Sequence, residues 1–142
     1  MPIDEQEAGW NAGTIADFRA HAGRITQGPL AGSRLLLLTT TGAVSGAPQT
    51  APLGYTLDGD RYVVVGSNSG AATNPAWLRN VQAQPEVTLE VGDETFTARA
   101  TVEEGDERRR LLDAHIRAIP IFARYETMTE RALPVVTFER LG

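Results

Sequence analysis

Short apolar segments separated by turn residues run along the chain and predict a protein built mainly from strands. The most apolar segment, Arg34–Thr41, contains four consecutive leucines and is therefore expected to be buried on both faces. The other expected strands are Thr50–Leu57, Arg61–Ser67, Glu86–Val91, Thr95–Val102 and Pro134–Glu139. Asp58-Gly59-Asp60 and Gly92-Asp93 are typical hairpin turns, so the strands that flank them are expected to pair antiparallel. Pro48 and Pro52 restrict the second strand to edge or bulged positions.

Apolar residues at helical spacing predict helices between these strands. Thr14–Ala22 is an expected helix, with Thr14 as its cap and Gly23 at its end. Asn74 as N-cap and Pro75 as the first helical residue predict a second helix that runs to Ala83. Further helices are expected over Glu107–Ala118 and within Ile121–Arg131. Residues 1–13 show no periodicity and are expected to form an N-terminal arm.

About six strands joined mostly by hairpins, with flanking helices, predict an α+β fold. In a chain of 142 residues, antiparallel strands favour a closed or nearly closed barrel, because closure removes exposed sheet edges. No repeat or linker divides the sequence, so residues 1–142 are expected to form a single domain.

The amino-acid composition limits which metals, partners and ligands are expected. The chain has no cysteine and only two histidines, far apart, so no metal site is expected. A net charge of -5 argues against a nucleic-acid partner, and no apolar run is long enough to span a membrane. The first residues are acidic and polar, unlike a signal peptide, so a cytoplasmic location is expected. There is no lysine, so an anionic ligand would be held by arginine or by backbone amides.

Several motifs together resemble the deazaflavin-dependent nitroreductase family, the split-barrel reductases that use coenzyme F420. The motifs are Leu35–Gly42, Ser45-Gly46, Pro48, Pro52-Leu53, Asp58–Val65 and Asn74–Trp77, with agreement also at Phe18–Ala20, Gly23, Tyr125, Thr129, Arg131 and Pro134–Val136. The resemblance covers residues 15–139. It implies a split β-barrel of the FMN-binding type, monomeric or homodimeric, with the cofactor in a groove. The implied reaction is hydride transfer from reduced F420 to a small conjugated, quinone-like or nitroaromatic molecule.

The same resemblance assigns the candidate site. Its cofactor-binding positions are Gly42, Ala43, Val44, Ser45, Gly46, Gln49, Asn68, Asn74, Pro75 and Trp77. Ser67 and Tyr125 are the candidate catalytic residues, which would polarise the oxygen of the hydride acceptor. Gly42, Ser45 and Gly46 can present backbone amides and a hydroxyl to an anion, and Asn74, Pro75 and Trp77 are expected to form a wall at a helix N-terminus.

Four of these positions lack the charge that the resembling family carries. Ala43, Val44, Gln49 and Asn68 stand where arginine or lysine is expected. A hydrogen bond to a charged group contributes roughly 1.5–3 kcal/mol, so their combined loss would weaken binding of an anionic cofactor severely. A second hypothesis is therefore that the chain has lost the cofactor. It would then act as a cofactor-independent cyclase or isomerase in a biosynthetic pathway, or bind a neutral apolar ligand. A third is a different flavin, FMN or FAD.

Each candidate also has a purely structural interpretation. Gly42 and Gly46 could serve the turn alone, Ser67 could cap a strand end, and Trp77 and Tyr125 could pack in the core. His115 lies on the apolar side of its expected helix and is expected to be a core or surface imidazole rather than a general base. Arg108-Arg109-Arg110 stands among acidic residues and is expected to be a solvated helix face with local ion pairs.

Overall fold

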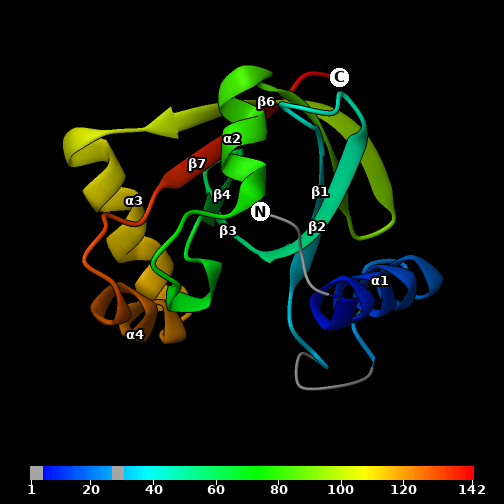
Figure 1. Ribbon diagram of the computed structural model, residues 1–142, viewed down its shortest axis with the longest axis horizontal. Helices are drawn as coiled ribbons and strands as arrows, with labels where there is room; N and C mark the ends of the chain where they lie inside the picture. Colours follow the sequence, from blue (N-terminus) through cyan, green and yellow to red (C-terminus); the bar gives the residue numbers. More distant parts are fainter. Residues whose placement is uncertain (1–4, 27–30) are drawn as a thin grey trace.

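The structure, a computed structural model, describes residues 5–26 and 31–142 (Figure 1). Its strands are β1 (Leu35–Thr41), β2 (Pro48–Gly54), β3 (Thr56–Asp58), β4 (Arg61–Val65), β5 (Glu86–Val91), β6 (Glu94–Glu103) and β7 (Val135–Arg140). Its helices are α1 (Glu5–Ala20), α2 (Ala76–Ala83), α3 (Gly105–Ala118) and α4 (Ile121–Met128), with a short 3₁₀ turn, η1, at Asn68–Gly70. The predicted α+β class is confirmed within this part of the chain.

The described strands form one curled sheet in the order β2-β1-β5-β6-β7-β4-β3, and every neighbouring pair is antiparallel. The strand expected over Thr50–Leu57 is two strands, which is a correction. β2 pairs with β1 and β3 pairs with β4, so these pieces lie at opposite ends of the sheet although only Tyr55 separates them. Both prolines lie in β2, at the sheet edge where a missing N–H is tolerated.

The two faces of the sheet carry three apolar clusters, one large cluster on the first face and two smaller ones on the other. On the first face, Leu36 and Leu38 of β1 pack with Val64 of β4, and Trp77 and Val81 of α2 cover them. This larger cluster also contains Leu78, Val87, Leu89, Phe96, Ala98, Ala100, Val136 and Phe138. Helix α2 therefore lies against the inner face of the curl.

The opposite face is covered in two places. Leu35 and Leu37 of β1 pack with Phe18 of α1, and Val63 and Val65 of β4 pack under α3 and α4. Figure 1 shows α1 well apart from the α3–α4 pair. The leucine run is thus buried on both faces, as predicted, because α1 and α2 cover its two sides.

Three helix starts differ from the prediction, and the smallest difference is in α3, which begins at Gly105 rather than Glu107. Helix α1 begins at Glu5, so Thr14 lies inside it and residues 5–13 are helical rather than an arm; residues 1–4 lie outside the described residues. Helix α2 begins at Ala76, and its N-cap is Pro75 rather than Asn74. The Asn74 side chain does not cap the helix because its Oδ1 accepts a hydrogen bond from Arg131 Nη1 at 2.8 Å.

Gly23 fixes the chain after α1 against the β5–β6 turn. Its φ is +90°, and a Cβ atom there would lie 2.5 Å from the Cα of Gly92. We expect Gly23→Ala to lower the free energy of unfolding by about 2–4 kcal/mol, since a left-handed backbone and an overpacked contact both penalise the methyl group. Gly32→Ala is the matched control, with φ +84° and open space around the added atom, and should lose only about 1–2 kcal/mol. Equal losses in chemical denaturation would show that the contact with Gly92 contributes nothing.

Candidate active-site groove

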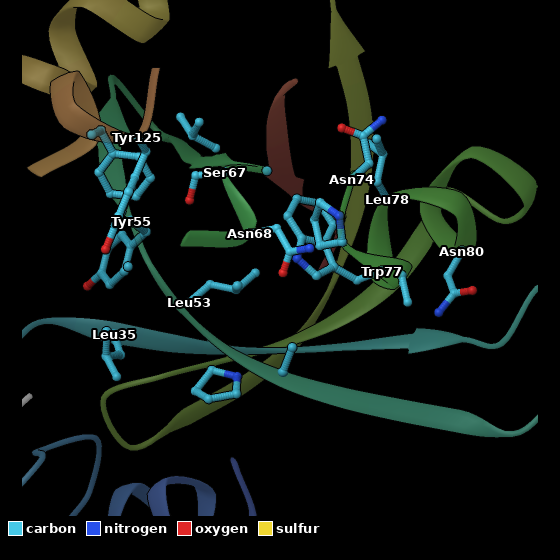
Figure 2. Close-up of a pocket in the computed structure, with 18 of the residues that line it drawn as sticks. Leu35, Leu53, Tyr55, Ser67, Asn68, Asn74, Trp77, Leu78, Asn80 and Tyr125 are labelled. Atoms are coloured by element: carbon cyan, nitrogen blue, oxygen red, sulfur yellow. The ribbon is translucent and has the colours of Figure 1, made fainter. Parts of the chain in front are cut away.

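A long groove opens beside the β2 edge, where the curled sheet does not close. Its volume is about 1780 Å³, which exceeds the roughly 300–1,000 Å³ of a typical small-molecule pocket and leaves room for a cofactor together with a substrate. Strand β2, the end of β4 and the start of α2 supply its walls, and α3 and α4 close one end. Figure 2 shows Tyr55 and Tyr125 at one end and Asn80 at the other, with Ser67, Asn68 and Trp77 between them.

Asn80 of α2 organises one end of this groove. Its side chain is buried and donates through Nδ2 to Thr40 Oγ1 and to Gln49 Oε1, both at 2.9 Å. Its Oδ1 accepts from the backbone amide of Ala43, also at 2.9 Å. One amide group therefore ties the helix to both strands of the β1–β2 hairpin and to the turn between them. Sequence inspection missed Asn80, because an isolated asparagine within a helix carries no local signal of a distant partner.

The turn itself is closed by its own hydrogen bonds. The amide of Gly42 donates to Ala47 O at 2.8 Å, and that of Gly46 donates to Gly42 O at 2.9 Å. The Ser45 hydroxyl accepts from the Ala47 amide at 3.1 Å. The amides of Gly42 and Gly46 are thus paired within the turn, and neither residue lines the groove. Ala43, Val44, Ser45 and Gln49 do line the groove.

The start of α2 offers an alternative place for an anion. Pro75 caps the helix without any side-chain hydrogen bond, and Pro75, Ala76 and Trp77 line the groove where the helix begins. The amide of Leu78 donates to Pro75 O at 3.2 Å, whereas no side chain caps the amides before it. Arg79, one turn further, also lines the groove, is exposed, and forms no ion pair within the described residues. Arg34 is a second lining arginine. The sequence-based search considered only the positions of the family motif and so missed both cations.

Ser67 lies in the middle of the groove at the end of β4. The residue is 7% exposed and lines the cavity, yet its hydroxyl forms no hydrogen bond among the described residues. Asn68 follows with φ +48° and donates its side-chain amide to Thr73 O at 3.1 Å. The Ser67 hydroxyl is therefore free to donate to a bound oxygen, as the resemblance implied.

Two tyrosines lie at the other end. Tyr125 of α4 packs edge-on against Phe122, with ring centroids 5.4 Å apart. Tyr55, the residue that joins β2 to β3, packs against Tyr62 at 5.7 Å and was missed in the sequence. Burial raises the pKa of Tyr55, with the positive charge of Arg34 acting in the opposite direction. Tyr55 therefore keeps its proton at neutral pH, and the hydroxyls of both tyrosines line this end of the groove as potential hydrogen-bond donors.

His115 belongs to the core beneath this end. It is fully buried in α3, its Nδ1 lies 2.8 Å from Thr56 Oγ1, and its ring meets Phe122 edge-on at 4.5 Å. Within the described residues its Nε2 has no hydrogen-bond partner. Burial lowers the pKa of His115 to about 4, so the imidazole is neutral at pH 7. His115 is thus buried in the core, as one of the expected interpretations had it, but only one of its two ring nitrogens is hydrogen-bonded among the described residues.

Residues 5–26 and 31–142 contain no group of three histidine, aspartate or glutamate side chains that could hold a metal. None of the helices in these ranges is both long and apolar enough to cross a membrane.

The groove combines aromatic walls, free hydroxyls and unpaired arginines, a set that suits a large, flat and partly anionic organic ligand.

Comparison with known proteins agrees with this chemistry. The model of the F420H(2)-dependent quinone reductase family matches residues 13–140, and the chain belongs to this family. It is 34% identical over 128 residues to the F420H(2)-dependent quinone reductase Rv1261c of Mycobacterium tuberculosis, covering 88% of this chain and 86% of the relative. The resemblance to F420-using reductases is thereby confirmed.

Solved structures place the fold in the same group. An F420-H2 dependent reductase, FDR-A, superposes with a TM-score of 0.68 at 36% identity, covering 74% of this chain and 93% of that one. A structure described as a domain-swapped dimer superposes with a TM-score of 0.71 at 32% identity, covering 93% and 98%. The predicted split-barrel type is therefore confirmed, and the described residues form seven strands where about six were expected.

The Asn80 contacts give a first test of the groove's construction. We expect Asn80→Ala to lower the free energy of unfolding by about 2–3 kcal/mol, because it leaves the Ala43 amide and the Gln49 side chain without their partner. Gln82→Ala is the control, since Gln82 is exposed on the same helix. Denaturant titrations that place both variants within 0.5 kcal/mol of each other would contradict the role given to Asn80.

His115 predicts a pH dependence of stability. The pKa of His115 is about 4 in the folded chain, below the ordinary histidine value of 6.5, so between these two pH values only the unfolded chain binds the proton. The contribution of the neutral imidazole to the free energy of unfolding is therefore complete above about pH 6.5. It is lost as the pH falls to about 4, and the total loss is about 3 kcal/mol. His115→Gln cannot titrate and should lose less stability over this window than the parent. Parallel curves of unfolding free energy against pH for the two proteins would show that His115 does not cause the pH dependence.

Proposed function

We propose that this chain binds reduced F420 in the groove and transfers its hydride to a small quinone-like molecule. The observation that carries this proposal is the free Ser67 hydroxyl in the middle of a groove that has tyrosines at one end and an open helix start with Arg79 near the other. Membership of an F420H(2)-dependent family supports the same assignment. Other conjugated or nitroaromatic acceptors would use the same donors.

The residues present fit the cofactor's charge distribution. F420 carries a phosphate and a glutamate tail, and the first-turn amides of α2 with Arg79 form the donor set suited to those anions. Trp77 offers an apolar wall beside them. The Gly42–Gly46 turn contributes shape rather than charge, since Asn80 and the turn's own carbonyls occupy most of its donors.

When bound, reduced F420 supplies the hydride, and the protein's task is to orient the acceptor and stabilise its charge. A quinone that accepts a hydride becomes a hydroquinone anion before it gains a proton. Ser67 donates to the oxygen where this charge develops, and a tyrosine hydroxyl, from Tyr125 or Tyr55, donates to that oxygen or to the opposite one.

Two arginines in the groove weigh against the cofactor-free hypothesis. A protein that binds only a neutral apolar ligand gains nothing from Arg79 and Arg34 beside its ligand, and family membership points the same way. The deciding measurement is a fluorescence titration of the purified protein with F420 at physiological salt. Micromolar binding, followed by oxidation of reduced F420 on addition of menadione, is expected. Failure to bind at saturating F420 would refute the proposed function.

Arg79 gives a sharper test of how the cofactor is held. We expect Arg79→Gln to weaken F420 binding about tenfold, since one charge-assisted contact is worth about 1.5 kcal/mol or more. It should leave unchanged the binding of the deazaflavin fragment that lacks the phosphate and glutamates. Arg124→Gln is the matched control, because Arg124 is an exposed arginine outside the groove. Equal F420 affinity in the two variants would show that the phosphate and glutamate groups of the cofactor do not bind at Arg79.

A further inference from the structure

Arg131 lies in the segment between α4 and β7 and does not itself line the groove, but its side chain hydrogen-bonds to residues that do. Its Nη2 donates to Ser67 O at 2.7 Å, and its Nη1 donates to Gly66 O at 3.1 Å and to Asn74 Oδ1 at 2.8 Å. Its Nε donates to Ala71 O at 3.1 Å. One guanidinium therefore binds the end of β4, the loop after η1 and the residue before the Pro75 cap.

No carboxylate neutralises this arginine within the described residues. Arginines such as Arg19, Arg61 and Arg109 form ion pairs with aspartate or glutamate, whereas every hydrogen-bond partner of Arg131 is an uncharged oxygen. Burial lowers the pKa of Arg131, but arginine still keeps its proton at neutral pH. A partly buried positive charge without a counter-ion is unfavourable, and here it lies directly behind Ser67.

The chain around Arg131 also constrains Gly66. The amide of Gly66 donates to Pro134 O at 2.8 Å, and a Cβ atom on Gly66 would lie 2.7 Å from Pro134 Cγ. The backbone before Ser67 is thus held on one side by Pro134 and on the other by the guanidinium. Contacts from the C-terminal part of the chain therefore hold the backbone that carries the Ser67 side chain.

We propose that Arg131 is a positioning residue for the groove, which fixes Ser67 and the start of α2 and favours negative charge on an oxygen bound at Ser67. The fixing of the loop stands on the geometry alone, and the effect on charge rests on the proposed function. The reaction itself needs no contact between Arg131 and the substrate. Its charge acts through the backbone dipoles it polarises and through the field it adds at the oxygen site.

Hydrogen exchange tests the fixing directly and needs no cofactor. In Arg131→Met we expect faster exchange of the Gly66, Gly70 and Ala71 amides, which are hydrogen-bonded in the parent chain. Arg108→Met is the matched control, because Arg108 is also half-buried and donates to a carbonyl of the same segment, Leu133 O at 2.9 Å, but does not line the groove. Unchanged exchange at these three amides in a folded Arg131→Met protein would overturn the proposal.

Steady-state reduction of menadione by reduced F420 tests the effect on charge. We expect Arg131→Met to lower kcat about 10- to 100-fold with a smaller change in KM, as when a reacting geometry is displaced, and Arg108→Met to leave kcat within about twofold. Arg131→Lys, which keeps the charge and serves if the methionine variant does not fold, should recover part of the loss. Ser67→Ala should have a smaller effect in the Arg131→Met background than in the parent, because the two residues act together.

Each result has a defined consequence. Independent, multiplicative effects of the two substitutions, or equal kcat losses in the Arg131 and Arg108 variants, would reject a role through Ser67. A parent protein that binds no F420 and reduces no quinone would refute the proposed function, and with it the effect on charge. The exchange measurement would still decide whether Arg131 fixes the loop.

Discussion

The architecture depends on one covalent constraint: strands β2 and β3, at opposite ends of the sheet, are joined through the single residue Tyr55. Because so short a link cannot cross an open sheet, the sheet must curl until its two ends approach each other. Since β2 pairs only with β1 and β3 only with β4, the curl does not close with hydrogen bonds. The opening between the ends becomes the groove, and Tyr55 lies in its wall as a direct consequence of the topology.

An opening in a sheet needs support, and here it comes from polar contacts that cross long stretches of sequence. Asn80 fixes α2 to the β1–β2 hairpin at one end, and Arg131 fixes the end of β4 and the loop before α2 from the other side. The side chain of Asn80 donates two hydrogen bonds and that of Arg131 donates four, all to oxygen atoms, and such directional contacts fix orientation in a way that apolar contacts do not. Apolar packing places α2 against the sheet, and these two side chains then fix where the groove's functional groups lie.

Local pattern was sufficient for most elements, because alternation and turn residues report on a strand's own neighbours. The leucines Leu35–Leu38 correctly predicted a strand that is buried on both faces, and Gly92-Asp93 correctly predicted the β5–β6 hairpin. The division of Thr50–Leu57 could not be predicted in this way, since two adjacent segments of similar composition pair with different strands. The sequence prediction of the site included Ser67 and Tyr125, because the family motifs mark these positions. It did not include Asn80, Tyr55 or Arg79, which no motif marks. Their roles depend on distant partners or on which wall of the groove they line.

The neutral turn shows how a fold can keep a groove while its charge is placed elsewhere. Ala43 and Gln49 stand where cations were expected, and both are bound by Asn80, one through its amide and one through its side chain. An arginine at position 49 would remove an acceptor from the Asn80 amide and place a second donor against it, so a cation there and the Asn80 contact exclude each other. A neutral residue at Gln49 is therefore part of how this chain builds the hairpin. It follows that the neutral turn does not by itself show that the cofactor has been lost, since Arg79, the residue before Asn80 in α2, adds a cation to the same groove.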